Sequence, residues 1–362
     1  MAKIVVKTNK IIENIEKINQ IFKSKKYKWT LILKMLSGNE AFLKKIIYNK
    51  VIKNIHSIGD SRISGLKKIK QINPKIKTMY IKPPPIQIVK SIISFADISV
   101  NSSYKTILAL NKEAKRQNKV HEIIIMLEMG ELREGVLPNK ILSFYTKIFS
   151  LKNIKVIGLG TNLGCLYGVE PTYDKLLQLN IYKKLLEQKF YRKIPLISGG
   201  SSITLPLIDQ NKIPKDVNHF RIGEAVFFGT SPLTTKKYRN LNTNNFEFVA
   251  NIIELEIKST SPKGKLSEGN IGHFKKNKEN NKTYRAILDF GILDVDYKDL
   301  VPKNKKNIFV GITSDMCIYD LGTKNNDFSK QKYYVGGNIK FKINYMAVAR
   351  LLNSKFIEIE FN

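Results

Sequence analysis

The chain has 362 residues, 43% of them apolar and 10% aromatic, so it is long and apolar enough for one large domain and a smaller one. Its net charge of +32 comes mostly from lysines spread over the whole length, which argues against a nucleic-acid-binding surface, where basic residues cluster on one face. Two cysteines argue against a disulfide framework, four histidines lack metal-ligand spacing, and no apolar run has the length of a membrane span. We therefore expect a cytoplasmic protein without a metal, nucleic-acid or membrane partner.

The first two thirds of the chain alternate short apolar runs with amphipathic segments. We predict eight strands, over Trp29–Met35, Asn54–Gly59, Thr78–Ile81, Asp97–Val100, Glu122–Glu128, Lys155–Gly160, Pro195–Ser198 and His219–Gly223. Apolar residues at i, i+3 and i+4 predict helices between them, among others over Ala41–Ile52, Tyr104–Gln117, Asn139–Phe149 and Thr172–Glu187. Eight such alternations within about 230 residues favour a (β/α)8 TIM-type barrel over residues 1–235. The alternative, an open doubly wound sheet, usually has a glycine-rich turn after its first strand, which is missing here.

Beyond residue 235 the helical periodicity stops. Strands are predicted over Phe246–Ile257, Tyr284–Phe290, Asn307–Asp315, Asn338–Asn344 and Phe356–Phe361, joined by turns rich in Gly, Asn and Lys and without intervening helices. This pattern indicates a separate, mostly antiparallel β domain over residues 236–362. The predicted fold class is therefore α/β, with an N-terminal barrel and a C-terminal β domain.

Chemically distinctive residues follow the predicted barrel strands. Lys34 stands in an apolar run, where an amine is costly unless it reaches solvent or a pocket in which it attacks a carbonyl. Glycine and serine follow the last two strands, in Ser198–Ser202 and Arg221–Glu224, where barrel enzymes commonly hold a phosphate. Turn-forming glycines and surface arginines are the simpler interpretation of each motif alone. Together, Lys34, Arg133, Arg221 and the phosphate cradle suggest an aldehyde-phosphate cofactor held as a Schiff base.

These segments resemble the fold type III pyridoxal-phosphate enzymes of the alanine racemase type, and within them the alanine/ornithine racemase-like branch. The resemblance extends over essentially the whole chain. It implies a racemase that uses pyridoxal 5'-phosphate, forms a homodimer with shared active sites, and acts on ornithine or another basic amino acid, or on alanine. The motifs that carry it are Thr30–Lys34, Gly59–Ile63, Leu132–Gly135, Gly160–Cys165, Ser198–Ser202 and Arg221–Ala225.

The resemblance also implies roles for single residues around the cofactor. Lys34 matches the lysine that binds the cofactor covalently and then acts as one of two catalytic bases. Arg133 matches the arginine at the cofactor's phenolic oxygen. Asn162 falls where typical alanine racemases have a histidine beside the pyridine ring.

The remaining cofactor contacts come from the last two strands. Ser201, Ser202 and Gly223 fall at the family's phosphate site, and Arg221 matches the arginine that faces the pyridine nitrogen. A guanidinium cannot accept a proton, so the ring nitrogen would stay unprotonated and electron withdrawal would be limited. This match therefore predicts racemisation rather than transamination.

The family's second base is a tyrosine of the partner's β domain, and the matching position here is Ile292, which cannot carry a proton. Asp294, Asp315 and Tyr345 from the same domain are candidates for this catalytic role, although each is also compatible with a structural role. Ser314 lies in the segment that matches the family's binding site for the substrate carboxylate, next to Met316, where the branch usually has a histidine.

A basic substrate would need an acidic group for its distal ammonium, because a buried unpaired charge is costly. Glu131, Glu134, Asp294 and Asp296 are the candidates. The alternative function is a non-catalytic protein that binds pyridoxal 5'-phosphate and takes part in cofactor homeostasis. The single-domain relatives with that role lack a β domain, and the predicted one here argues against it.

Overall fold

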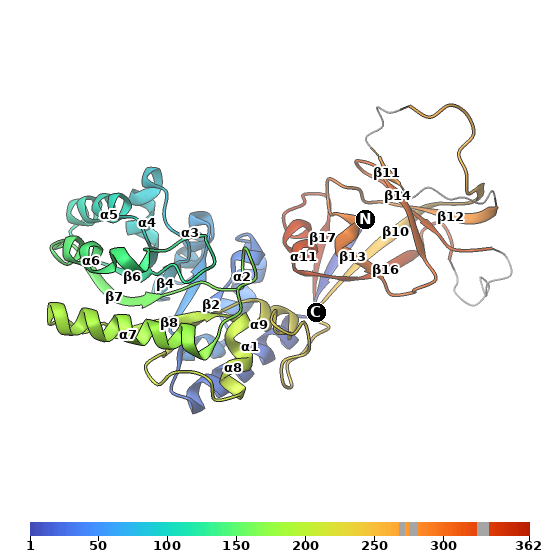
Figure 1. Cartoon of the computed structure of the whole chain (residues 1–362). Coiled ribbons are helices and arrows are strands. Elements are labelled where there is room, and N and C mark those ends of the chain that lie inside the picture. Colours follow the sequence, from blue (N-terminus) through green and yellow to red (C-terminus); the bar gives the residue numbers. More distant parts are fainter. Residues whose placement is uncertain (268–271, 275–280, 324–332) are drawn as a thin grey trace. The chain divides into compact units, whose positions relative to one another are not determined.

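The computed structural model describes residues 1–267, 272–274, 281–323 and 333–362, and these form two compact units (Figure 1). One unit contains Lys10–Thr243, and the other combines Met1–Asn9 with Asn244–Asn362. The first unit is a barrel and the second is a β domain.

The larger unit is a closed barrel of parallel strands in sequence order, which confirms the predicted fold class. Strand β9 pairs with β2 and closes the barrel. A buried apolar cluster that includes Met79, Val100 and Met126 forms part of its core. The strands are β2 (Lys28–Ile32), β3 (Ser57–Asp60), β4 (Thr78–Tyr80), β5 (Ile98–Asn101), β6 (His121–Met126), β7 (Ile154–Gly160), β8 (Leu196–Ser201) and β9 (His219–Ile222).

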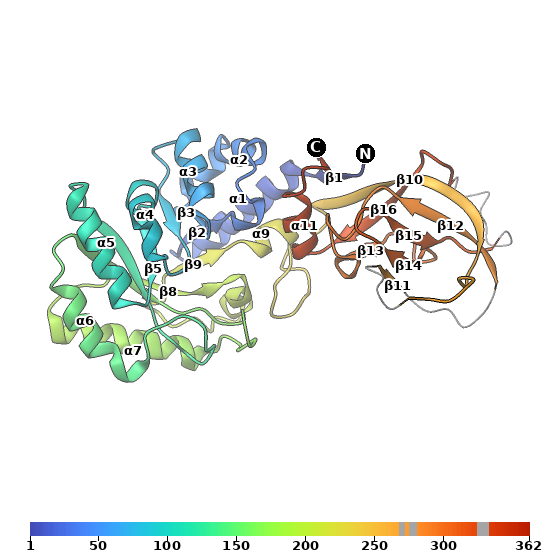
Figure 2. The same ribbon diagram turned by 90° about the horizontal axis from the view of Figure 1, so that it is seen from above.

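Helices lie outside the barrel strands, as Figure 2 shows. Two of them begin at hydroxyl caps: Ser103 Oγ accepts from the N–H of Thr106 at 3.4 Å, and Thr172 Oγ1 accepts from the N–H of Lys175 at 3.3 Å. The α-helices here are α1 (Thr8–Ser24), α2 (Glu40–Ile47), α3 (Ile63–Ile72), α4 (Val89–Phe95), α5 (Tyr104–Arg116), α6 (Ile141–Phe149), α7 (Tyr173–Phe190), α8 (Leu205–Asp209) and α9 (Glu224–Phe228).

The first barrel strand ends earlier than predicted. It stops at Ile32, and Lys34–Leu36 forms a 3-10 turn that buries Met35 and Leu36 while leaving Lys34 exposed. The apolar run therefore continues through a turn, because both conformations can bury the same side chains. The predicted helix over 41–52 also ends early, at Ile47, because Asn49 caps a separate turn.

The smaller unit is built on a mixed sheet with the strand order β11-β14-β15-β12-β10-β1-β17, and β16 pairs with β10 and β13. Pairings among the described strands are antiparallel except β1 with β17. Phe248, Phe290 and Phe341 pack against one another in its core. The strands are β1 (Lys3–Val6), β10 (Phe246–Ser259), β11 (His273–Phe274), β12 (Lys282–Leu288), β13 (Leu300–Pro302), β14 (Ile308–Ile312), β15 (Cys317–Asp320), β16 (Asn338–Ile343) and β17 (Glu358–Phe361).

Two features of this unit differ from the sequence-based prediction. The N-terminal strand β1 pairs with β10 and β17, so residues 1–9 belong to the β unit rather than to a barrel over 1–235. The sequence of a short apolar strand does not indicate which sheet the strand joins. Pairing with strands distant in the sequence decides its place. Helix α11 (Tyr345–Leu351) interrupts the predicted run of strands, and the Asn344 side chain caps it.

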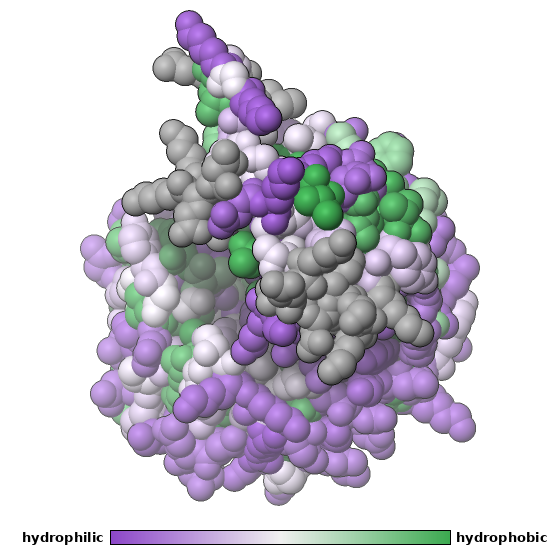
Figure 3. All heavy atoms as spheres, turned by 90° about the vertical axis from the view of Figure 1, so that its right-hand side faces the viewer, coloured by the Kyte–Doolittle hydropathy of each residue, from purple (hydrophilic) through white to green (hydrophobic). Residues whose placement is uncertain are grey.

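The surface agrees with the lysine-rich composition. Figure 3 shows hydrophilic residues over most of one face of the molecule. In the described parts of the chain, no helix has the length and apolar character that crossing a membrane requires. Among those same residues, no group of three or more His, Cys, Asp or Glu side chains could hold a metal ion.

Candidate active site

The residues singled out in the barrel all lie at or just beyond the C-terminal ends of its strands. Because the strands are parallel, their C-terminal ends form one rim of the barrel. The structure therefore brings together on this rim Lys34, Arg133, Asn162, Ser201, Ser202, Arg221 and Gly223.

Lys34 begins the turn after β2 and is close enough to two carboxyls to influence them. Burial raises the pKa of Asp60, at the end of β3, to about 6, although the N–H groups of Arg62 and Ser61 and the nearby charges, that of Lys34 among them, oppose this. Burial also raises the pKa of Glu224, and the Lys34 charge again opposes the shift. The Lys34 amine thus lies in a region where two carboxyls protonate more easily than usual.

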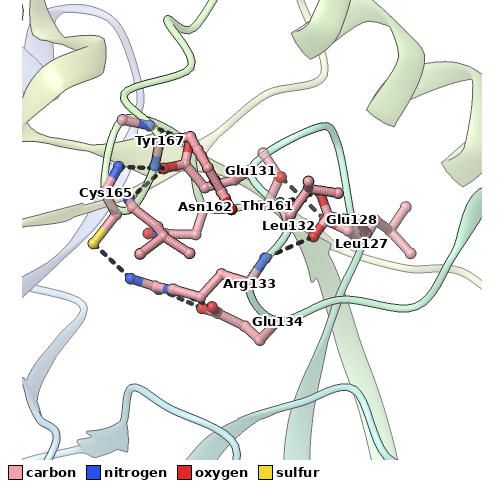
Figure 4. Close-up of polar contacts among 12 residues, drawn as sticks. Leu127, Glu128, Glu131, Leu132, Arg133, Glu134, Thr161, Asn162, Cys165 and Tyr167 are labelled. Atoms are coloured by element: carbon pink, nitrogen blue, oxygen red, sulfur yellow. Dashed lines mark hydrogen bonds and ion pairs between the residues drawn. The ribbon is translucent and has the colours of Figure 1, made fainter.

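The loop after β6 is folded around the carboxylate of Glu128 (Figure 4). That carboxylate accepts from the N–H groups of Gly130 at 2.6 Å, Leu132 at 3.0 Å and Arg133 at 3.1 Å. Gly135 has φ +156°, and a Cβ there would lie 2.2 Å from the Glu128 nitrogen, so only glycine fits. The backbone on both sides of Arg133 is therefore fixed within its own loop.

Glu131, in the same loop, holds the neighbouring loop after β7 (Figure 4). Glu131 is only 2% exposed, and its carboxylate accepts from the six consecutive backbone N–H groups of residues 164–169. Burial alone would raise the pKa of Glu131, but these N–H groups lower it to about 2. The carboxylate is thus fully engaged, which removes Glu131 from the candidates for binding a substrate ammonium.

Arg133 projects between the two loops, as Figure 4 shows. Its guanidinium forms an ion pair with Glu134, and Nη2 donates to Glu134 Oε1 at 2.6 Å. Nη1 donates to Cys165 Sγ at 2.5 Å. Asn162, turned with its carboxamide oxygen toward Arg133, accepts from Nη2 at 2.8 Å. Glu134 and the loop after β7 therefore determine where the guanidinium points.

Arg221 is a buried positive charge of the rim, with 6% of its surface exposed. Its guanidinium donates to Ser198 Oγ and to the Thr161 carbonyl, the latter at 2.7 Å. Burial lowers the pKa of Arg221 to about 10, so the side chain is still charged at neutral pH. Sequence reasoning identified Arg221 but not its two acceptors, because a serine within a strand and a backbone carbonyl carry no sequence signal.

The predicted phosphate cradle is assembled from the ends of β8 and β9. Ser202 Oγ accepts from the N–H groups of Gly223 at 3.4 Å and Ala225 at 3.2 Å. Gly200, just before the two serines, has φ +135°, which side-chain-bearing residues rarely adopt. Ser201 is half-buried beside this contact.

Two turns of the β unit bring together Ile292, Asp294, Ser314 and Asp315. The N–H of Ile292 donates to the Thr313 carbonyl at 3.0 Å, which joins the 291–294 turn to the 313–316 turn. Asp294 accepts from Ser354 Oγ at 2.7 Å and from the Gly291 N–H at 3.2 Å, so it stabilises its own turn. Asp315 is exposed and accepts from Ser314 Oγ at 3.2 Å.

The other two candidates of this unit have structural partners. Asp296 caps the turn that follows it and lies 3.7 Å from an Arg350 Nη1. Tyr345 is the first residue of α11 and is half-buried.

Comparison with known proteins identifies the family. The family model for the alanine racemase N-terminal domain matches residues 6–232. Ornithine racemase from Acetoanaerobium sticklandii is 33% identical over 359 residues, which is 99% of each chain. Lysine racemase from Thermotoga maritima is 27% identical over 98% of this chain and 97% of its own.

Solved structures of alanine racemases share the fold of this chain. Alanine racemase from Bacillus anthracis with bound L-Ala-P superimposes with a TM-score of 0.76 at 12% identity, over 100% of this chain and 95% of that one. Alanine racemase from Clostridium difficile 630 gives a TM-score of 0.73 at 14% identity, with the same coverage. The family model and the full-length similarity to ornithine racemase show that this chain belongs to the alanine racemase family.

Proposed function

We propose that this amino-acid racemase uses pyridoxal 5'-phosphate and interconverts the L and D forms of a basic amino acid, ornithine being the first candidate. The observation that carries the proposal is the rim of the barrel, where Lys34 shares one edge with the two arginines Arg133 and Arg221. The full-length relatives named ornithine racemase and lysine racemase support the substrate class. Alanine remains the alternative substrate.

The rim residues fit this cofactor by their chemistry. Its phosphate and phenolic oxygen are anionic, and the rim offers guanidinium groups, serine hydroxyls and the N-terminal N–H groups of α9. We propose that Ser201, Ser202 and Gly223 hold the phosphate. Arg133 would hold the phenolic oxygen, and Lys34 would hold the aldehyde carbon.

When bound, the cofactor supplies an electron-withdrawing ring that acidifies the α-proton of the amino acid. The Lys34 amine, once free of the cofactor, would remove or return that proton at Nζ. Arg221 would face the ring nitrogen, with Asn162 beside the ring. Because a guanidinium only donates, this arrangement limits electron withdrawal and favours quick return of the proton, hence racemisation over transamination.

A second proton carrier is required on the opposite face, and Ile292 cannot serve. We propose that it comes from the β unit of a partner subunit, with Asp315 as the first candidate because its carboxylate is exposed. The Ser314 segment would bind the substrate carboxylate. The working unit would then be a homodimer with shared sites. The two free cysteines fit a reducing, cytoplasmic compartment.

The test is proton NMR in D2O with purified protein, added cofactor and, separately, L-ornithine, L-lysine and L-alanine. We expect the α-proton signal to disappear and the D-isomer to appear, fastest with ornithine. The same protein stripped of cofactor is the control. Visible absorbance of bound cofactor without α-proton exchange on any amino acid would contradict the proposal and favour the non-catalytic, cofactor-binding function.

A further inference from the structure

Polar side chains cross the interior of the barrel beneath Arg221. Thr30 on β2, Ser57 on β3, Ser198 on β8 and His219 on β9 each have no more than 2% of their surface exposed. Barrel interiors of this kind are usually filled by branched apolar residues, and a buried polar group is costly unless it is hydrogen-bonded. Four such groups on adjacent strands are therefore expected to be hydrogen-bonded inside the barrel.

The partners form one continuous chain that begins at Arg221. The guanidinium donates to Ser198 Oγ, which lies 2.9 Å from His219 Nδ1. His219 Nε2 lies 2.9 Å from Thr30 Oγ1, and Thr30 Oγ1 lies 2.7 Å from Ser57 Oγ.

The far end of the chain lies at the start of β3. Ser57 Oγ lies 3.3 Å from His56 Nδ1, and His56 is only partly buried. The chain thus runs from the site's buried arginine, through the strands at the closure of the barrel, to a half-exposed histidine.

The proton directions follow from the first member of the chain together with the acceptors within reach. A guanidinium can only donate, so the Ser198 hydroxyl accepts from Arg221, and His219 Nδ1 is the acceptor at hand for the hydroxyl's own proton. The imidazole then carries its proton on Nε2 and donates to Thr30. The Thr30 hydroxyl can donate to Ser57 Oγ at 2.7 Å or to Met79 Sδ at 3.8 Å.

The charges agree with this assignment, in which His219 accepts at Nδ1 and is therefore neutral. Burial lowers the pKa of His219 well below its usual range, and the charges of His56, Arg221 and Lys28 act in the same direction. Burial also lowers the pKa of His56 to about 4; the charges of Lys77 and Lys28 add to this effect and that of Glu122 opposes it. Both histidines are therefore uncharged at neutral pH.

We infer that His219 is a positioning residue for the reaction: as the neutral Nε2–H tautomer, held between Thr30 and Ser198, it orients the Ser198 hydroxyl and thereby fixes the Arg221 guanidinium. This inference rests on the proposed function, in which Arg221 faces the ring nitrogen. It assigns a role to residues that are not among those proposed to hold the cofactor. Without the chain, Ser198 could rotate and the buried guanidinium would lose a fixed acceptor.

The barrel offers a matched control in a second buried histidine. His121, 4% exposed at the start of β6, lies with Nε2 2.8 Å from Ser99 Oγ, and burial lowers its pKa to about 4. Asn101 Nδ2 donates to the same hydroxyl at 2.9 Å. Among the described residues, no hydrogen bond connects this cluster to Arg221. An effect common to buried histidine clusters would therefore appear when either cluster is altered. An effect that depends on positioning Arg221 would appear only when the His219 cluster is altered.

The first measurement is nitrogen-15 NMR of histidine-labelled protein without cofactor, assigned with His219→Asn. We expect His219 to be neutral with its proton on Nε2 between pH 6 and 8. A charged imidazole, or a proton on Nδ1, would overturn the inference. This result does not depend on racemase activity, so it is separate from any failure of the proposed function.

The second measurement compares Thr30→Val and His219→Ala with Ser99→Ala in the cofactor-loaded protein. We expect His219→Ala to lower kcat about tenfold and to shift the absorbance of bound cofactor, with KM changed less than about twofold, because the Ser198 hydroxyl loses its acceptor and no longer fixes the Arg221 guanidinium. His219→Asn, whose Oδ1 can replace Nδ1 as acceptor, should recover part of this loss.

Thr30→Val conserves shape and keeps the inference testable if the alanine variant does not fold. It should lower kcat about threefold, whereas Ser99→Ala should leave kcat and absorbance within about twofold of wild type. Equal effects of Thr30→Val and Ser99→Ala, or none from His219→Ala, would overturn the positioning role. Unaltered cofactor absorbance in every variant would do the same.

Discussion

At the scale of single residues, one carboxylate connects two loops of the candidate site. Glu131 collects six backbone N–H groups from the loop that carries Cys165, and Cys165 contacts Arg133. Glu131→Gln should destabilise the protein by roughly 3 kcal/mol. The glutamine carboxamide carries no charge, and its NH2 group would face backbone N–H groups that also donate. Denaturant unfolding measures this change. Glu113→Gln, which breaks a helix-surface pair with Arg116, should change the unfolding free energy by less than about 1 kcal/mol.

Release of the loop after β7 in Glu131→Gln should also change the reactivity of the Cys165 thiol. Cys165 is exposed and Cys317 is fully buried, so a thiol reagent reports on Cys165 in the folded protein. We expect a faster reaction in Glu131→Gln than in wild type. An unchanged rate of thiol modification together with an unchanged free energy of unfolding would show that the loop after β7 keeps its conformation without Glu131.

Glu131 also implies a pH dependence with a definite sign. The pKa of its carboxyl is lowered in the folded protein to about 2 from an ordinary value of 4.5. Its contribution to stability is therefore fully present above pH 4.5 and is lost as pH falls toward 2. Between pH 5 and 3 the wild type should lose more stability than Glu131→Gln, as unfolding curves at the two pH values would show. Parallel losses would contradict the assignment.

Lys34 carries the residue-scale prediction of function. Lys34→Ala should abolish both α-proton exchange and the visible absorbance of bound cofactor, because it removes the amine proposed to attach the cofactor. Lys34→Arg is the matched control, since it keeps the charge and removes the nucleophile, and it should lose the same two signals. Retention of the absorbance in either variant would move the covalent attachment to another lysine.

At the scale of elements, strand β1 ties the start of the chain to the β unit. Ile4 is fully buried between β10 and β17. Ile4→Ala should cost about 2–5 kcal/mol, because it leaves a cavity in the middle of a sheet. Lys3→Ala, which removes an exposed ion pair with Glu360, should leave the denaturant midpoint close to that of the wild type. If the two variants unfolded at the same denaturant concentration, β1 would not be an integral strand of this sheet.

The boundaries of elements were less predictable than their existence. Strand β3 begins at Ser57 rather than at Asn54, because the preceding residues form a 3-10 turn capped by Asn49. Strand β10 extends to Ser259, beyond the predicted Ile257, because β12 pairs with it along that end. In both cases the local apolar pattern suits either conformation, and a neighbouring segment decides.

At the scale of the whole molecule, the proposed shared site makes a subunit-mixing prediction. Lys34→Ala inactivates the barrel contribution, and Gly291→Ala should inactivate the β contribution, since a Cβ there would lie 2.2 Å from the Ser314 carbonyl oxygen. Dimers mixed from the two inactive variants would contain one intact site. We expect activity to reappear on mixing after partial denaturation and refolding. No recovery, despite mixed dimers in native mass spectrometry, would contradict a shared site.

The sequence by itself determined the barrel, the β domain and the rim residues, because alternating periodicity and the residues that follow strands are local properties. It identified Lys34, Arg133 and Arg221 on one rim through the rule that parallel strands end together. Only the tertiary structure decided that residues 1–9 pair within the β unit. It also decided that the Glu131 carboxylate binds the backbone of a loop and is not available for a substrate ammonium, and that His219 connects Thr30 to Ser198. The physical reason is that hydrogen-bond partners separated by tens to hundreds of residues are selected by the fold and leave no trace in local sequence.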